Sequence, residues 1–169
     1  MGKVKKKVQR QKGNITKMTA VIQRVKKAAV NVEGQTVGAV NDGLLILLGV
    51  KEGDSEREAE KMAEKILKMR IFEDENGKMN LSVTDVSGEI LVISNFTLCA
   101  SCRRGTRPDF FGAAKPGVAC KLYEYFKVRL SEGGVKVESG EFGADMKIST
   151  ELDGPVTIIL DSEKDFAKA

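Results

Sequence analysis

The side chains of this sequence that can do chemistry gather where an apolar run ends in hydroxyl and amide groups. The segment Ser94–Leu98 reads SNFTL, and it closes the apolar run Ile90–Ser94. Functional groups are often placed where a strand gives way to a loop. Ser94 and Thr97 supply hydroxyls, Asn95 supplies an amide, and the turn supplies backbone N–H groups. The segment is therefore a candidate site, although a strand that simply ends in polar residues has the same local pattern.

The chain of 169 residues contains no histidine and three cysteines. The absence of histidine excludes Ser-His-Asp and Cys-His catalytic centres and any histidine general base. Cys99 and Cys102 form a lone C-x-x-C, but a zinc site needs four ligands and the chain offers at most three cysteines. An odd cysteine count without a secretory signal indicates free thiols. We expect no metal and no cofactor, so an enzyme with this sequence would use carboxylates, lysine, backbone dipoles or its own substrate.

The segment Arg103–Phe111, RRGTRPDFF, mixes cations with aromatic rings. Phosphates and nucleobases are bound by those two chemistries. The candidate RNA-binding residues are therefore Arg103, Arg104 and Arg107. A solvated loop whose phenylalanines enter the core fits the same pattern.

Two further segments, near the C-terminal end, have chemical interest. Gly154-Pro155 stands at the start of an apolar stretch that reads as a buried strand. Proline has no backbone donor and fixes φ, so the pair is either a plain turn or a rigid backbone fixture. The segment Gly140–Met146, GEFGADM, contains Phe142 and Met146, which either line a pocket or belong to the core.

The charge is distributed unevenly along the chain. Residues 1–17 carry seven basic residues and no acid, which leaves 21 basic against 24 acidic residues in the remainder. This basic extension either binds nucleic acid non-specifically or is no part of the working protein. We expect three parts: the extension, a single domain over 18–161 and a charged tail over 162–169. No apolar run approaches the ~18 residues of a membrane span, and no secretory signal is evident, so a cytoplasmic location is expected.

The periodicities predict an α+β fold. Apolar and alternating runs predict strands over 19–25, 28–32, 36–40, 44–50, 90–94, 135–137, 147–150 and 156–160. Ser55 and Glu58 form a capping box before an apolar stripe of helical period, and a second amphipathic helix spans 119–130. The strands follow one another mostly as hairpins, without βαβ alternation. We therefore expect a curved, mostly antiparallel sheet or partial β-barrel that carries two helices.

Taken in order, six segments resemble one family. They are IQRV (22–25), RIF followed by GKMNLS (70–82), SNFTL (94–98), RRGTRPDF (103–110), GEFGADM (140–146) and DGPVT (153–157). Each segment alone is weakly specific, but the ordered set resembles the D-aminoacyl-tRNA deacylases over residues 18–161.

The resemblance implies an activity, a partner and an assembly. The family hydrolyses the ester that joins a D-amino acid, or mischarged glycine, to the terminal adenosine of tRNA. It acts as a homodimer with its active sites at the subunit interface. The resemblance implies that Gly154-Pro155 is a cis peptide that reaches into the other subunit's pocket and rejects L side chains sterically.

The resemblance also implies roles for individual residues. The segment from Ser94 through Phe96 to Thr97 would surround the scissile carbonyl with donors. Thr97 is the family's candidate nucleophile, but without histidine nothing evident would activate it, so assistance by the ribose 2′-OH is expected instead. Arg24 would anchor the Gly154-Pro155 element, and the aromatic and thioether side chains would hold the adenosine, namely Phe96, Phe142 and Met146.

The sequence differs from the family pattern in the predicted site, and two other readings remain open. Asn95 replaces the usual glutamine, and Leu152 replaces an asparagine two residues before Gly154. One alternative is a divergent tRNA-editing deacylase with relaxed chirality. The other is a non-catalytic RNA-binding protein that uses the basic extension and the arginine-rich loop.

Overall fold

The structure is a computed structural model that describes residues 18–166; the predicted basic extension, residues 1–17, lies outside the described residues. The strands are β1 (Thr19–Val32), β2 (Gln35–Val40), β3 (Gly43–Gly49), β4 (Phe72–Glu73), β5 (Met79–Leu81), β6 (Glu89–Ser94), β7 (Lys136–Ser139) and β8 (Lys147–Asp161). The helices are α1 (Glu56–Lys68), α2 (Pro116–Glu132), α3 (Ser162–Asp165) and the 3-10 helix η1 (Phe96–Cys99).

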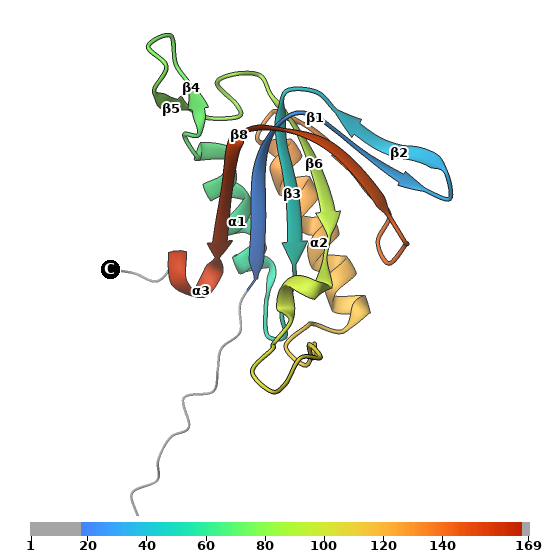
Figure 1. Cartoon of the computed structure of the whole chain (residues 1–169). Coiled ribbons are helices and arrows are strands. Elements are labelled where there is room, and N and C mark those ends of the chain that lie inside the picture. The colour runs from blue at the N-terminus through green and yellow to red at the C-terminus, as the bar shows by residue number, and fades with distance from the viewer. Residues whose placement is uncertain (1–17, 167–169) are drawn as a thin grey trace, which may run out of the picture.

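Six strands form one strongly curved sheet (Figure 1). The order is β2-β1-β3-β6-β7, and β8 pairs with β1 on a further edge. The first and last strands of this order, β2 and β7, lie close together. A Cβ added to Gly38 of β2 would lie only 2.7 Å from the carbonyl oxygen of Ser139 in β7. The sheet is thus nearly closed, and the predicted α+β fold with a partial barrel is confirmed.

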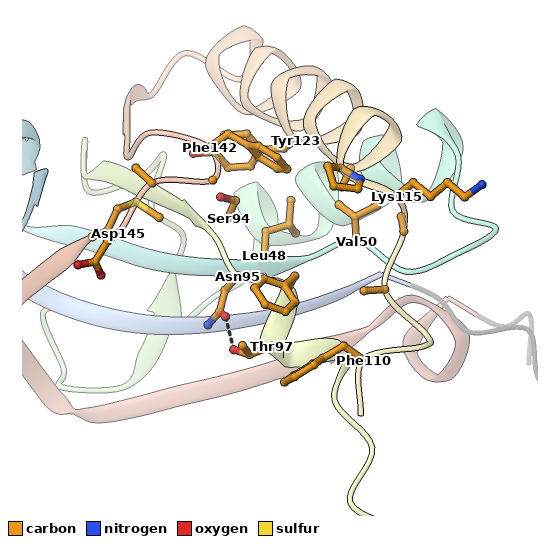
Figure 2. Close-up of a pocket in the computed structure, with 18 residues that line it drawn as sticks. Leu48, Val50, Ser94, Asn95, Thr97, Phe110, Lys115, Tyr123, Phe142 and Asp145 are labelled. Atoms are coloured by element: carbon orange, nitrogen blue, oxygen red, sulfur yellow. Dashed lines mark hydrogen bonds between the residues drawn. The ribbon is translucent and has the colours of Figure 1, made fainter. Parts of the chain in front are cut away.

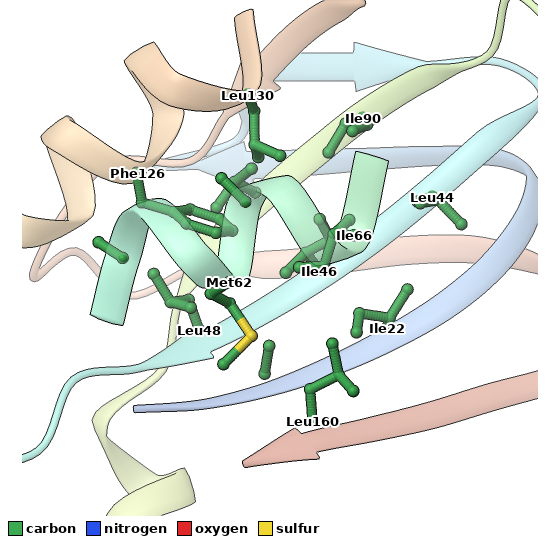
Figure 3. Close-up of a cluster of buried hydrophobic side chains, with 14 of the residues drawn as sticks. Ile22, Leu44, Ile46, Leu48, Met62, Ile66, Ile90, Phe126, Leu130 and Leu160 are labelled. Carbon is green, nitrogen blue, oxygen red and sulfur yellow. The ribbon is translucent and has the colours of Figure 1, made fainter. Parts of the chain in front are cut away.

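Both faces of the central strands are buried. In β3, Leu44, Ile46 and Leu48 face α1 and α2, whereas Leu45 and Leu47 face the concave interior of the sheet. Both helices pack on this face of the sheet, and Figure 3 shows Met62 and Ile66 of α1 directed toward the strands. This double burial explains why the sequence of β3 is continuously apolar rather than alternating.

The first helix forms as its sequence predicts. The Ser55 side chain caps α1 and accepts from the Arg57 amide at 3.3 Å, while Glu58 accepts from the Ser55 amide at 2.9 Å. One stripe of α1 is buried, comprising Ala59, Met62, Ala63 and Ile66. The cap satisfies backbone donors that the helix itself leaves unpaired.

Three predictions about the elements are wrong in detail. The strands expected over 19–25 and 28–32 are the single strand β1, and those over 147–150 and 156–160 are the single strand β8. The expected lack of βαβ connections is also wrong, because β3 pairs with β6, and β6 with β7, in parallel. The helices α1 and α2 lie on these two connections. The charged tail predicted over 162–169 is not contradicted, and its first residues form the short helix α3.

Candidate active site

The end of β6 is held against β3, and this fixes the SNFTL segment. The Asn95 amide donates to the Leu48 carbonyl at 2.8 Å, one residue beyond the last strand pair, and η1 follows directly. A Cβ at Gly49 would lie 2.9 Å from the Leu98 Cβ and 3.2 Å from the Asn95 carbonyl oxygen. Glycine at this position therefore allows η1 to close against the end of β3.

A pocket of about 830 Å³ opens beside this segment. It lies between the ends of β3 and β6, the start of α2 and the loop that contains Phe142 (Figure 2). The structure brings together six of the predicted site residues in its lining, namely Ser94, Asn95, Phe96, Thr97, Phe142 and Met146. Its size is within the range of small-molecule sites, and most of its other side chains are apolar.

The polar groups of the pocket are hydroxyls, an amide and backbone N–H groups. The Thr97 hydroxyl donates to the side-chain oxygen of Asn95, and Thr97 is exposed to solvent. Ser94 is half-buried. The backbone amides of Phe96 and Thr97 donate to no acceptor within residues 18–166. The site therefore offers unpaired donors close to its hydroxyl groups.

Tyr123 forms the back wall of the pocket, a role that the sequence did not indicate. Its hydroxyl donates to the Val92 carbonyl at 2.9 Å, and its ring lies 5.9 Å from that of Phe142. Burial raises the pKa of Tyr123 to about 12, so the phenol stays protonated at neutral pH. The helical periodicity identified Tyr123 only as a core residue, because one apolar stripe serves both the core and the pocket.

Aromatic and charged side chains lie at the rim of the pocket. The rings of Phe96 and Phe110 meet edge to face with centroids 5.1 Å apart. Lys115, the residue before α2, also lines the pocket and is exposed. The only carboxylate in the lining belongs to Asp145, which pairs with Lys147 at 2.9 Å. The sequence did not indicate that Phe110, Lys115 and Asp145 would line the pocket.

The second predicted group of site residues lies on β1 and β8, outside this pocket. The Gly154-Pro155 peptide is cis, as the resemblance implied, and both residues are exposed. Between the pairs Gln23↔Thr157 and Val25↔Leu152, Arg24 alone faces four residues of β8. The Gly-Pro pair is therefore held in a wide bulge of an otherwise continuous strand.

Arg24 is buried beneath this bulge. Its guanidinium Nη1 donates to the Ile71 carbonyl at 2.7 Å, and its Nε lies 3.0 Å from a carboxylate oxygen of Asp153. The Nε contact has poor hydrogen-bond geometry, so we treat it as an ion pair. Arg24 thus pairs with the residue that precedes Gly154, and a Cβ added to Gly154 would lie 3.5 Å from its Nη2 atom.

The three arginines of the arginine-rich loop line neither the pocket nor the bulge of β8. Arg103, Arg104 and Arg107 are exposed. The loop is closed at its base by two backbone hydrogen bonds between Ser101 and Asp109, of 2.9 and 3.0 Å. The structure therefore presents these arginines to solvent rather than directing them into the pocket.

The described residues contain no group of three or more potential ligands that could hold a metal ion. The three cysteines are free thiols, as expected. Cys99 is buried and its thiol donates to the Val50 carbonyl at 3.4 Å, and burial raises the pKa of that thiol. Within residues 18–166, no helix has the length and apolar character needed to cross a bilayer.

Residues 21–161 match the model of the family described as D-Tyr-tRNA(Tyr) deacylase. A protein of Thermosipho africanus (strain TCF52B) named D-aminoacyl-tRNA deacylase is 54% identical over 149 residues, which cover 88% of this chain and 100% of that protein. One of the same name from Geotalea uraniireducens (strain Rf4) is 56% identical over 147 residues, 87% of this chain and 95% of that protein.

Two solved structures resemble the fold. One, a c-Myc DNA unwinding element binding protein, has a TM-score of 0.80 and 40% identity, and covers 85% of this chain and 98% of its own. The other, described as a probable eukaryotic D-amino acid tRNA deacylase, has a TM-score of 0.76 with the same coverage. Its identity is only 17%, so that likeness supports the fold alone.

Proposed function

The chain belongs to the D-Tyr-tRNA(Tyr) deacylase family, and on that premise we propose that it hydrolyses the ester bond of D-aminoacyl-tRNA. The products are a free D-amino acid and uncharged tRNA. The observation that carries the proposal is the SNFTL segment with its unpaired amides at the edge of the pocket. Glycine esterified to tRNA is a second substrate in this proposal, since it has no side chain to reject.

The terminal adenosine enters the pocket, and the ester carbonyl lies over Phe96 and Thr97. Water attacks the carbonyl carbon, the developing oxyanion accepts from the backbone amides, and the ribose 3′-oxygen leaves with a proton. Donors aimed at such an oxyanion contribute roughly 3–4 kcal/mol each. The aromatic and thioether side chains of the pocket support adenosine binding, namely Phe96, Phe142 and Met146.

The ribose 2′-OH of the substrate assists the attacking water. The pocket supports this assignment because its side chains include no histidine, and Asp145, its one carboxylate, is paired with Lys147. The Thr97 hydroxyl donates to an amide oxygen, which is not a base that could deprotonate it. Positioning of the substrate hydroxyl therefore supplies what a general base supplies in other esterases.

The chain works as a homodimer in which Gly154 and Pro155 of one subunit close the pocket of the other. Two observations support this part of the proposal. Neither residue lines the pocket of its own chain, yet both are exposed. Large apolar side chains are exposed along the same strand, namely Ile148, Leu152 and Ile159. A backbone wall at the substrate α-carbon admits D side chains of any size and blocks L side chains.

The exposed arginines at positions 103, 104 and 107 contact the phosphates of the tRNA. Their unpaired charge supports this role, because phosphate contacts position a nucleic acid without reading its sequence. Replacing all three by alanine should lower the salt dependence of binding, with the slope falling by about one for each phosphate that an arginine had bound.

The first test compares hydrolysis of D-Tyr-tRNA and L-Tyr-tRNA by the full chain without added metal. Rapid loss of the D ester alone is the expected result. Loss of both esters would indicate an editing deacylase with relaxed chirality. Loss of neither, with tight RNA binding, would favour a non-catalytic nucleic-acid-binding protein, the class that the name of one solved relative suggests.

Mixed dimers test the cross-subunit element. Gly154→Ala displaces the wall, and Ala144→Trp fills the pocket from a loop that lines it. Gly154→Ala alone should hydrolyse both esters, and Ala144→Trp alone should hydrolyse neither. Unfolded and refolded together at equal amounts, the two variants should hydrolyse the L ester at about half the rate expected from the Gly154→Ala subunits present, since about half of the open pockets then face an intact wall. An unreduced rate on the L ester would contradict a site shared between subunits.

A further inference from the structure

The rim outside the pocket carries an excess of unpaired positive charge. Four cations and one acid lie between residues 100 and 115, although the chain from residue 18 onward has more acidic than basic residues. Elsewhere on the surface cations pair with acids, for example Lys26 with Asp42 and Arg129 with Glu60. The four rim cations are Arg103, Arg104, Arg107 and Lys115. None of them forms an ion pair or side-chain hydrogen bond with any described residue.

Phe111 lies between Arg107 and Lys115 in the sequence, and at 89% it is the most exposed large apolar side chain within residues 18–166. Its backbone is fixed on both sides. The Phe111 amide lies 3.4 Å from the carboxylate of Asp109, and the next carbonyl, that of Gly112, accepts from the Glu52 amide at 2.9 Å. The Ala114 amide donates to Val50 at 3.0 Å. The exposure of the ring is therefore imposed by an anchored backbone.

The aromatic side chains continue outward from the pocket. Phe96 and Phe110 line it and touch edge to face, and Phe111 is the next residue beyond them. Lys115 borders the pocket from the start of α2, where Figure 2 shows its side chain extending outward. An exposed ring among free cations, beside a pocket that takes a nucleoside, is the combination that binds a single RNA strand.

We propose that Phe111 stacks on an unpaired nucleobase that precedes the terminal nucleoside of the substrate RNA, while Lys115 contacts the phosphate between them. This inference rests on the proposed function, because that function places the terminal nucleoside in the pocket. It adds a binding site outside the pocket and a reason for the enzyme to prefer tRNA over a shorter ester. Stacking on a ring tolerates any base, so the site does not depend on the tRNA's identity.

A second copy of this chain is a poorer occupant of the same surface. In a two-fold symmetric contact the same patch meets itself, so the four rim cations would face four like charges. Phosphates neutralise those charges instead, and binding then releases counterions from the RNA. Charge complementarity thus favours a nucleic acid strand.

Kinetics on a long and a short substrate test the proposal. The long substrate is D-Tyr-tRNA, and the short one is the same amino acid esterified to adenosine. Phe111→Ala should raise KM for the long substrate about tenfold, leave its kcat unchanged, and leave both constants for the short substrate unchanged. Phe111→Trp should retain the wild-type KM. Val128→Ala, which truncates an exposed apolar side chain on α2, is the matched control and should change neither substrate.

Direct binding gives a readout that needs no turnover. The probe is an unacylated single-stranded RNA of four nucleotides ending in adenosine, followed by fluorescence anisotropy at several salt concentrations. Phe111→Ala should weaken binding about tenfold. Lys115→Ala should reduce the salt slope by about one, while Lys121→Ala, which removes a cation farther along α2, should leave it unchanged.

The outcomes separate the two proposals. One outcome is that the wild type and Phe111→Ala both hydrolyse the long and the short substrate, with the same KM for the long one. That result would overturn the stacking site and leave the proposed function intact. An equal effect on the long and short substrates would also overturn it, because Phe111 would then act on the pocket. If the wild type hydrolyses neither ester, the proposed function is wrong. The stacking site is then decided by binding, and equal affinity of the wild type and the variant overturns it.

Discussion

The hydroxyl of Thr97 donates a hydrogen bond to the side-chain oxygen of Asn95, two residues earlier in the same turn. A hydroxyl that acts as a nucleophile must instead give its proton to a base, and an amide oxygen does not serve as one. No histidine exists anywhere in the chain to take that place. The contact therefore orients the turn rather than activating the threonine.

Thr97→Ala should keep the rate of D-Tyr-tRNA hydrolysis within about tenfold of the wild type, a loss of up to about 1.4 kcal/mol. The physical reason is that the variant removes a positioning contact and leaves the backbone amides in place. Single-turnover kinetics provide the measurement. Near-total loss in Thr97→Ala, with full activity in the Thr97→Ser control, would identify the hydroxyl as a reacting group.

Arg24→Met should destabilise the fold by about 2–3 kcal/mol, because it leaves the buried Ile71 carbonyl without its donor and removes the closer of the two cations that pair with Asp153. The measurement is urea unfolding at neutral pH. Lys27→Met is the matched control three positions along β1. Lys27 pairs with Glu151 at the surface, so its removal should cause no measurable loss. Equal effects of the two changes would show that the buried arginine does not fasten the bulge.

Gly154→Ala should lower both stability and chiral selectivity. Gly154 has a φ of +128°, and an added Cβ would lie 2.7 Å from the Val156 amide nitrogen. The backbone must shift to relieve that contact, at a cost of about 1–3 kcal/mol. The ratio of D-Tyr-tRNA to L-Tyr-tRNA hydrolysis should fall.

Gly34→Ala separates conformational strain from steric contact. Gly34 also has a positive φ, of +80°, but no atom lies within 4 Å of an added Cβ. The Gly34→Ala variant should lose only about 1 kcal/mol of stability and keep the wild-type selectivity for the D ester. If Gly154→Ala behaves in the same way, the bulge does not control chirality.

Titration of Asp54 should lower the free energy of unfolding as the pH rises from about 4 to about 6. Burial raises the pKa of Asp54 from 3.8 to about 6, against the effect of the amides of Lys51 and Met18, which donate to its carboxylate. Between those values the folded state holds a proton that the unfolded state has released, so raising the pH favours unfolding. The stability of the wild type relative to Asp54→Asn should therefore drop by about 1–2 kcal/mol from pH 4 to pH 7, after allowance for partial screening.

Asp74→Asn is the control of opposite sign. The Lys78 amide, which donates to its carboxylate, holds the pKa of Asp74 below its usual value. The ionised form is favoured in the folded state, so the wild type should gain stability over this variant as pH rises through the acid range. Urea unfolding at pH 4 and pH 7 measures Asp54→Asn, whereas Asp74→Asn is measured at about pH 2 and about pH 5, across the range in which the Asp74 carboxylate takes up its proton. The same sign for the two would contradict these assignments.

Most helices and strands could be predicted from short stretches of sequence, because the alternation of apolar and polar residues in each stretch follows which side chains are buried. The capping box at Ser55, the apolar stripe of α1 and the doubly buried strand β3 each follow from neighbouring residues. The long strands did not follow from local pattern. Lys26 and Lys27 interrupt the alternation of β1, yet β1 continues because β8 pairs along nearly its whole length. Pairing between residues so far apart in the sequence leaves no local signal.

The candidate site was predictable where a motif and a strand end coincide. SNFTL was found from its polar residues after an apolar run, and it does line the pocket. Tyr123 and Lys115 were missed, because a helix stripe and a lone exposed lysine carry no signal of their own. The distance between Gly154-Pro155 and the pocket of the same chain was also beyond the sequence, since it depends on how β8 crosses the sheet.

Tyr123 joins the pocket to the core, whereas Phe111 belongs to neither. If the proposed function holds, a change at Tyr123 would alter both the binding of the adenosine and the thermal stability of the protein, so random mutation would rarely improve one without harming the other. A change at Phe111 has no such penalty. On the proposals made above, substitutions outside the pocket could change the affinity for tRNA without loss of stability, whereas substitutions in the wall of the pocket are limited by the packing of the core.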